Sequence, residues 1–110
     1  MAFFNESLGL RPGGDDQTVL LDTRPEHQVA PETIHFAVLT TLAEVSAARA
    51  VAASAVPVEV NVSLLRRAVP GRLEGKGIVL KRGRTLAFTE GEVRQDGKLV
   101  AKAAITFAVL

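Results

Sequence analysis

Glu44 is the residue whose type and surroundings most strongly suggest chemistry. It lies in a stretch rich in alanine and leucine, directly after Ala43 and before Val45, where burying an ionised carboxylate is costly. A carboxylate in such surroundings can act as a general base or as a nucleophile. Two other roles stand beside the catalytic one: a position on the exposed face of a helix, and a charge partner of Arg49, which is five positions later rather than the favoured four.

Several common kinds of active site are disfavoured by what the sequence lacks. With no cysteine, the chain has no thiolate nucleophile, no disulfide and no sulfur ligand for a metal. It has neither the Gly-x-Ser-x-Gly turn of serine hydrolases nor the glycine-rich loops that bind nucleotide phosphates. Only His27 and His35 could supply imidazole to a metal. We therefore expect no metal site.

His35 stands at the start of the helical stretch that contains Glu44. Backbone N–H groups at a helix start have no intrahelical acceptor, and the helix dipole favours negative charge there. An ordinary capping or core histidine is the alternative role. The two residues are nine positions apart, which at about 100° per residue is half a turn beyond two full turns. Within one chain they point to opposite sides, so a catalytic site that uses both requires a second subunit.

Two helices are predicted, and the longer one carries these residues. Residues 34–53 contain neither glycine nor proline, which predicts a helix with Thr33 as its N-cap. We expect this helix to be buried on most sides, because small side chains line much of it beside an apolar stripe of Val38, Leu42 and Val45. A short helix over residues 2–10 is expected to end at Gly9.

Strand patterns account for most of the remaining sequence. The alternation from Val56 to Leu64 is the clearest strand signal and predicts one buried face. Asp96-Gly97 predicts a two-residue hairpin, and Gly75 and Gly77 mark a bulge or a close backbone approach. Four further strands are expected over residues 17–24, 72–82, 85–94 and 98–109. This order of elements is that of an α+β fold in which an antiparallel sheet packs on one helix.

Length and composition fit one domain over residues 1–110. With 47% hydrophobic residues, the chain can bury an apolar core. The N-terminus lacks a basic segment before an apolar one, and no apolar run approaches the roughly 18 residues that span a bilayer. Together with the lack of cysteine, this predicts a cytoplasmic protein with no membrane partner. A small sheet has edge strands whose unpaired backbone groups can be covered by a second copy of the chain, so we expect self-association.

The net charge of +1 conceals a basic segment. Residues 66–84 contain seven basic residues and one acid, a local balance of +6 that leaves −5 for the rest. A basic patch on a nearly neutral domain favours a discrete anionic ligand over nucleic acid, whose sequence-independent binders usually carry a strong overall positive charge. The alternative is that these charges only solvate the outer side of strands.

Four segments resemble hotdog-fold acyl-CoA thioesterases of the phenylacetate (PaaI) type. His35 to Glu44 reads His-Phe-Ala-Val-Leu-Thr-Thr-Leu-Ala-Glu and is similar to that family's His-Gly-Gly-x-x-x-x-Leu-Ala-Asp/Glu. The other three are residues 60–71, similar to a strand ending in Arg-Pro-x-x-x-Gly, residues 81–86, similar to an Arg-Gly-Arg-Thr-Leu turn, and the closing hairpin at 96–101. The resemblance covers roughly residues 15–110. It implies a hotdog fold, in which an antiparallel sheet wraps a long central helix, in homodimers or homotetramers.

The resemblance also implies hydrolysis of the thioester of a small or aromatic acyl-CoA. Glu44 would be the nucleophile or the base that activates water. The backbone N–H of Phe36 would stabilise the oxyanion, an effect typically worth about 3 kcal/mol per donor. His35 and Gln28 complete the implied catalytic set. The residues implied to bind coenzyme A are Arg66, Arg82, Gly83 and Arg84. The acyl chain would lie along the helix, and no cofactor is expected beyond the coenzyme A of the substrate.

Four positions depart from the family's pattern. Phe36 and Ala37 replace the two glycines, Val29 stands where an Asn or Gln is usual, and Glu32 stands where a glycine is customary. Gln28, one position from Val29, could supply the missing amide. These departures favour a second function, a hotdog protein that binds acyl-CoA or a related acyl ligand without hydrolysing it. A dehydratase or hydratase is a third possibility, although the Asp–His pair of that chemistry is not evident.

Overall fold

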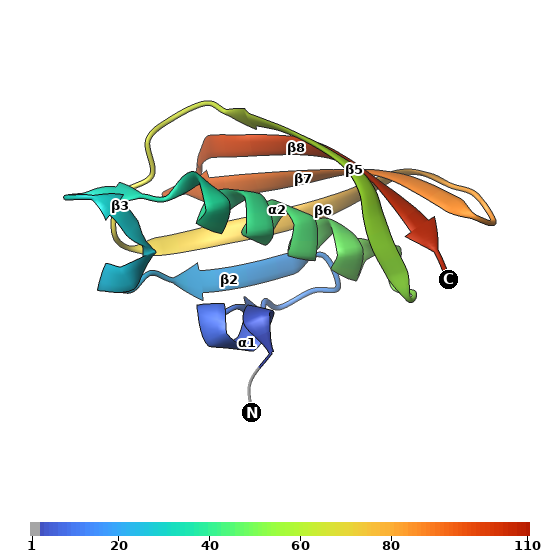
Figure 1. The fold of residues 1–110 in the computed structure, drawn as a ribbon, viewed down its shortest axis with the longest axis horizontal. Helices are drawn as coiled ribbons and strands as arrows, with labels where there is room; N and C mark the ends of the chain where they lie inside the picture. The colour runs from blue at the N-terminus through green and yellow to red at the C-terminus, as the bar shows by residue number, and fades with distance from the viewer. Residues whose placement is uncertain (1–2) are drawn as a thin grey trace.

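A six-stranded antiparallel sheet curves around one long helix, α2 (Phe36–Val51), which crosses its concave face (Figure 1). The computed structural model describes residues 3–110. This arrangement confirms the predicted α+β architecture and hotdog fold. In their order across the sheet, the strands are β1 (Arg11–Pro12), β2 (Thr18–Asp22), β6 (Arg72–Arg82), β7 (Leu86–Gln95), β8 (Lys98–Val109) and β5 (Ala55–Leu64).

The segment before α2 contains short elements. Helix α1 (Phe4–Leu8) ends at Gly9 in the left-handed conformation, φ 98°, as predicted, whereas residue 2 of the expected helix lies outside the described residues. The segment between β2 and α2 contains a 3₁₀ turn, η1, and a small hairpin. These elements are η1 (Pro25–His27), β3 (Gln28–Ala30) and β4 (Thr33–Ile34).

The start of α2 corrects the sequence prediction, because the N-cap is His35 and not Thr33. Ile34 is held in β4, where its N–H donates a 2.9 Å hydrogen bond to the carbonyl oxygen of Ala68. The helix therefore begins two residues later than expected. The Nδ1 atom of His35 accepts a 2.9 Å hydrogen bond from the N–H of Ala37. A capping role was the alternative that the sequence left open for His35, and that is the role it has.

Helix α2 packs directly on glycine positions of the sheet. A Cβ atom at Gly77 would collide with the carbonyl oxygen of Ser46, and one at Gly91 would collide with that of Ala43. The glycines thus let the helix backbone lie against the strands, which confirms the predicted close approach. The largest fully buried side chains surround these contacts and are Leu21, Leu42, Leu73, Ile105 and Phe107.

Strand β5 lacks the buried face that its alternating sequence predicts. It forms the edge of the sheet and pairs only with β8 in the described part of the chain. The side chains of Val56, Val58 and Val60 are between 43 and 60% exposed. Because α2 packs mainly on β6 and β7, it does not reach far enough to cover them. A long edge strand of this kind is open to pairing with another chain.

Except for β1, which pairs with β2 and was not predicted, the remaining strands of the large sheet lie close to their predicted positions. The bounds of β6 and β8 are those expected, and β7 is shifted by one residue. Asp96 and Gly97 have positive φ angles of 51° and 78° between the paired residues Gln95 and Lys98, which is the geometry of the predicted two-residue hairpin.

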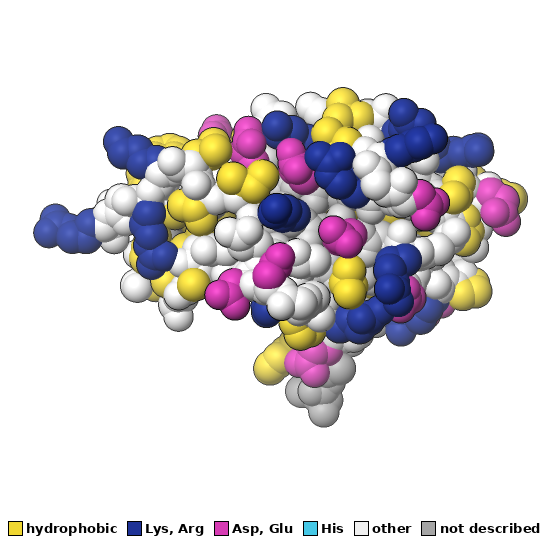
Figure 2. Space-filling view, turned by 180° about the vertical axis from the view of Figure 1, so that it is seen from behind, with side chains coloured by type: hydrophobic (Ala, Val, Ile, Leu, Met, Phe, Trp, Pro, Cys, Tyr) yellow, Lys and Arg dark blue, Asp and Glu magenta, His cyan; other side chains and the backbone are white. Residues whose placement is uncertain are grey.

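The face of the sheet opposite α2 carries both signs of charge, as Figure 2 shows. Lys102 lies 3.5 Å from a carboxylate oxygen of Glu90 and 3.8 Å from one of Glu92. Such partly exposed pairs contribute little to stability. The exposed side chains of Leu80 and Phe88 add an apolar area to this face. Within residues 3–110, no helix is both long enough and apolar enough to cross a membrane.

Candidate active site

Glu44 is a half-buried carboxylate on α2. Burial raises the pKa of its carboxyl group above the ordinary value. Within residues 3–110 the carboxylate makes no ion pair, and the guanidinium of Arg49 instead donates a 3.1 Å hydrogen bond to the carbonyl oxygen of Asp15. The pairing with Arg49 is therefore not found. A desolvated, unpaired carboxylate suits a proton acceptor more than a structural ion pair.

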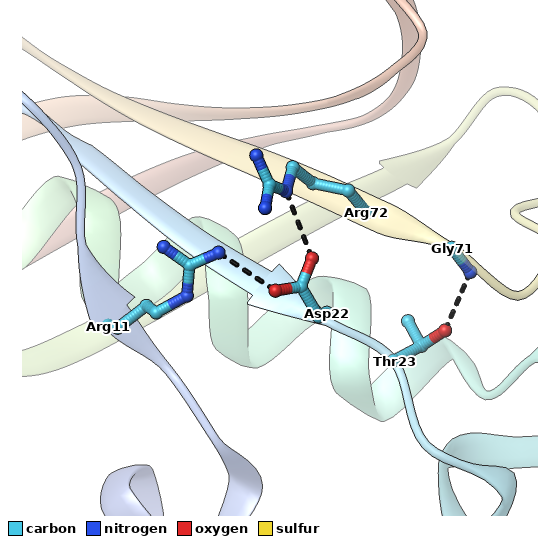
Figure 3. A network of polar contacts seen from close by, with 5 residues as sticks. All are labelled: Arg11, Asp22, Thr23, Gly71 and Arg72. Atoms are coloured by element: carbon cyan, nitrogen blue, oxygen red, sulfur yellow. Dashed lines mark hydrogen bonds and ion pairs between the residues drawn. The ribbon is translucent and has the colours of Figure 1, made fainter.

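Asp22 shows the opposite environment (Figure 3). Its exposed carboxylate lies 2.9 Å from the Nε atom of Arg72 and 2.8 Å from a terminal nitrogen of Arg11. Hydrogen bonds from these two guanidinium groups lower the pKa of Asp22 to about 2. Next to this network, the hydroxyl of Thr23 accepts a 2.8 Å hydrogen bond from the N–H of Gly71. Asp22 thus ties β2 to its neighbours, whereas Glu44 remains free to exchange a proton.

The first turn of α2 leaves one N–H group available. The Nδ1 of His35 accepts a hydrogen bond from the N–H of Ala37, and the carbonyl oxygen of His35 accepts one of 3.0 Å from the N–H of Val38. The N–H of Phe36, the first helical residue, has no intrahelical acceptor. It lies at the positive end of the helix dipole. This geometry suits the predicted oxyanion contact, and it gives the His35 imidazole a structural role in the first turn.

A groove of about 450 Å³ lies beside the start of α2. Its size falls within the range of small-molecule sites. The β3–β4 hairpin, the first turn of α2 and the chain after β5 form its walls. Its lining is apolar except for Thr33 and two arginines, and consists of Val29, Thr33, Ile34, Phe36, Leu39 and the segment from Leu64 to Ala68.

Arg66 is therefore close to Phe36, although 30 positions separate them in the sequence. Leu64, Leu65 and Arg67 were not among the predicted site residues. The sequence signal was a pair of leucines followed by two arginines at the end of a strongly alternating strand, but it points to a site only together with the position of β5 at the sheet edge.

Gln28 does not line this groove. Its side-chain oxygen accepts a 2.9 Å hydrogen bond from the N–H of Glu32, whose φ of 58° is left-handed. The amide thus closes the β3–β4 turn. Val29, the residue in the family's amide position, instead exposes its side chain at the groove.

Phe36 and Glu44 are not brought together in one protomer. They are eight residues apart in the same helix, which corresponds to about 12 Å along its axis. The two predicted parts of the catalytic site, the oxyanion donor and the carboxylate, therefore do not reach one carbonyl group within one chain.

The predicted coenzyme A contacts are also divided between the two ends of α2. The guanidinium of Arg82 donates a hydrogen bond to the carbonyl oxygen of Val51, the last residue of the helix. Gly83 and Arg84 are exposed in the following turn. Arg66 lies at the other end, about 24 Å away along a 16-residue helix. One protomer does not place all three arginines on one phosphate group.

Comparisons with known proteins identify the family. Residues 23–108 match the model of the acyl-CoA thioesterase N-terminal domain. The conserved protein PA5202 from Pseudomonas aeruginosa is 30% identical, with a TM-score of 0.90, over 100% of this chain and 95% of that one. The phenylacetic acid degradation protein PaaI from Thermus thermophilus, solved as a mutant, is 28% identical, with a TM-score of 0.88, over 97% of this chain and 98% of that one.

A third structure, the BH2602 protein from Bacillus halodurans with CoA, is 21% identical and shares the fold, with a TM-score of 0.89, over 100% of this chain and 77% of that one. No curated protein sequence matches the chain. The family model spans most of the chain, and the solved structures similar to the chain include PaaI. The protein therefore belongs to the acyl-CoA thioesterase family and is a hotdog protein of the PaaI type.

Proposed function

We propose that the protein hydrolyses the thioester bond of a small or aromatic acyl-CoA, with Glu44 as the catalytic carboxylate. The observation that carries this proposal is the state of Glu44: half-buried, without an ion-pair partner in residues 3–110, and with a raised pKa. A proton acceptor works best when its pKa lies near the working pH. The family membership supplies the substrate class.

The site is proposed to form between two subunits. A two-fold axis through the exposed edge of β5 pairs this strand with its copy in antiparallel orientation. The two α2 helices then run in opposite directions. Phe36 of one subunit can thus approach the partner subunit's Glu44, and Arg66 of one subunit can approach the partner subunit's Arg82. The oxyanion donor and the carboxylate, which are far apart in one protomer, would then meet across the subunit boundary, and so would the two arginines.

The reaction follows from the two groups. The Phe36 N–H polarises the thioester carbonyl and stabilises the negative charge that develops on its oxygen. The carboxylate of Glu44 takes a proton from water, whose oxygen attacks the carbonyl carbon. The carbon–sulfur bond breaks, and the proton returns from Glu44 to the thiolate of coenzyme A. Attack by Glu44 itself, followed by hydrolysis of the anhydride, is the other form of the same proposal.

The test compares the wild type with Glu44→Gln on acetyl-, benzoyl-, phenylacetyl- and palmitoyl-CoA, with release of free thiol as the readout. We expect turnover of the first three by the wild type and a loss of at least about 100-fold in Glu44→Gln, which keeps the shape of the side chain but removes the base. Glu74→Gln, an exposed change on β6, is the matched control. Unchanged turnover in Glu44→Gln would rule out the catalytic role.

The subunit arrangement is tested separately by sedimentation. Val58→Lys places a charge at the β5 edge and is expected to give monomers with little activity. Phe4→Lys, at an equally exposed apolar position on α1, should leave the dimer intact. A wild-type protein that is monomeric and fully active contradicts the proposed two-subunit site.

A second candidate function is acyl-CoA binding without hydrolysis. The engagement of the Gln28 amide in the β3–β4 turn favours it, because Val29 then offers no polar group at the groove. Binding of acyl-CoA with no thiol release for any ester of the panel would select this function.

A further inference from the structure

The groove beside α2 gathers exposed apolar side chains around a buried floor. Val29, Phe36, Leu64 and Leu65 are each between 52 and 59% exposed, and all four line this groove. Beneath them the side chains of Ile34 and Leu39 are buried in the core. Large contiguous apolar areas on a protein surface usually mark a place where a ligand or a partner binds.

Two arginines give the groove a positively charged end that can bind an anion. Arg66 and Arg67 follow the apolar segment directly and line the same groove. Within residues 3–110 neither guanidinium takes part in an ion pair. Unpaired guanidinium groups match phosphate oxygens well. An apolar groove that ends in two unpaired guanidinium groups fits a molecule that has an apolar group and phosphates. The acyl-CoA of the proposed function has both.

Phe36 holds a particular place in this groove. Its ring stacks on the imidazole of His35, with ring centroids 4.7 Å apart and an angle of 28° between planes. That imidazole is in turn fixed by the N–H of Ala37. The ring is therefore held at its position although more than half of it is exposed. Its own backbone N–H is the proposed oxyanion donor, so the ring stands next to the position of the thioester carbonyl.

We infer that the Phe36 side chain selects the acyl group, because its ring forms the wall of the groove immediately beyond the position of the thioester carbonyl. A flat aromatic acyl group can lie against the ring face, where aromatic pairs gain energy beyond area burial. An acyl group that is fully branched at the carbon next to the carbonyl meets the ring and is excluded. This inference rests on the proposed function for the location of the carbonyl, and concerns selectivity rather than catalysis.

The test measures binding and hydrolysis in parallel. The binding probes are two non-hydrolysable thioethers, S-benzyl-CoA and S-neopentyl-CoA, titrated calorimetrically into the wild type, Phe36→Ala and Phe36→Leu. Hydrolysis is measured as kcat/KM for benzoyl-CoA and trimethylacetyl-CoA. Phe88→Ala, which removes an exposed ring from the opposite face of the sheet, is the matched control.

We expect the wild type to bind the benzyl thioether at least about 10-fold more tightly than the neopentyl one. In Phe36→Ala this ratio should fall by about 10-fold, within the roughly 10–200-fold range of small changes in an apolar pocket. Phe36→Leu should give an intermediate ratio, and Phe88→Ala should leave it unchanged. Because the Phe36 ring is exposed, Phe36→Ala is expected to remain folded by circular dichroism, and Phe36→Leu keeps most of the apolar bulk.

The inference would be overturned by an unchanged binding ratio in Phe36→Ala, by the same change in Phe88→Ala, or by wild-type protein that binds neither thioether. Dissociation of the oligomer in Phe36→Ala would also overturn it, because the ring would then serve a subunit contact. A changed binding ratio without hydrolysis of any ester would support the selectivity role and reject the hydrolytic function.

Discussion

Arg82 and Val51 join strand β6 to the C-terminal end of α2, because the Arg82 guanidinium donates a hydrogen bond to the Val51 carbonyl oxygen. The last carbonyl groups of a helix lack intrahelical donors, and a cation is favoured at this end of the helix dipole. Arg82 thus has a role in holding the helix on the sheet, in addition to the coenzyme A contact predicted from the family resemblance.

Removal of this contact should cost stability. Arg82→Ala is expected to lower the free energy of unfolding by about 1 kcal/mol, because a typical hydrogen bond contributes about 0.5–1.5 kcal/mol net and the Arg82 side chain is exposed. Arg84→Ala, in the exposed turn that follows, should change it by less than about 0.5 kcal/mol. Urea unfolding at neutral pH measures both. Equal losses in the two variants would show that the Val51 contact is not responsible.

Glu44→Gln should make the protein more stable at neutral pH. Burial raises the pKa of Glu44, so the folded state disfavours the ionised form relative to the unfolded state. This penalty is absent at low pH and grows as the pH rises above the ordinary glutamate pKa of 4.5. A neutral glutamine avoids it. Thermal unfolding at about pH 7.5 should give a higher Tm for Glu44→Gln, and the difference should shrink at about pH 4. A lower Tm near neutral pH would contradict the desolvated carboxylate.

Gly77→Ala should strongly destabilise the fold. Its Cβ would collide with the backbone of Ser46, and backbone atoms in a helix cannot move aside as a flexible side chain can. Forcing extra atoms into a packed interior typically costs about 1–3 kcal/mol. Gly14→Ala is the matched control, because a Cβ there meets nothing within 4 Å. Chemical denaturation of the two variants checks the difference, which should vanish if α2 does not press on β6.

Stability should fall between about pH 7.5 and pH 5.5 because of His27. This side chain is buried, and its Nδ1 accepts a 2.9 Å hydrogen bond from the N–H of Arg24. Burial, and then the Arg24 charge, lower the pKa of His27 below its ordinary value of 6.5, with Glu26 acting in the opposite direction. The unfolded state therefore binds a proton first, so the stabilisation is complete above the ordinary histidine pKa and is lost as the pH falls.

His27→Gln removes this titration and provides the comparison. The Tm of the wild type should fall relative to that of His27→Gln as the pH decreases over the same range, because the titration of Glu44 is common to both proteins and cancels in the difference. Asp22, with a pKa of about 2, loses its stabilising effect only below about pH 4 and does not interfere. Parallel pH profiles for the two proteins would exclude His27 as the cause.

Local patterns predicted most of the fold, and the exceptions depend on contacts between distant segments. Alternation and turn residues suffice to locate β6 and β8. Thr33 is a good N-cap by residue type, but Ile34 is held as a strand by Ala68, which is far along the chain. The side chains of β5 remain exposed for a related reason, since burial of an edge strand depends on what lies beside it.

The candidate site was predictable to a similar degree. Glu44 was recognisable because a charged residue in an apolar helix is unusual. The groove was not, because Val29 and Leu65 come together only through the return of β5 to the far edge of the sheet. Arg66 and Arg82 lie at opposite ends of α2, and no local pattern in the sequence encodes that separation.

The glycines beneath α2 have a consequence for attempts to redesign substrate range. With helix backbone resting on strand backbone at Gly77 and Gly91, a side chain added at either position collides with α2, so the spacing between the two layers is fixed at these points. Under the proposed function, longer or bulkier acyl groups would be accommodated along the flank of the helix, by changes at exposed positions such as Phe36 that hardly affect folding. Substrate preference would then change with little loss of thermodynamic stability.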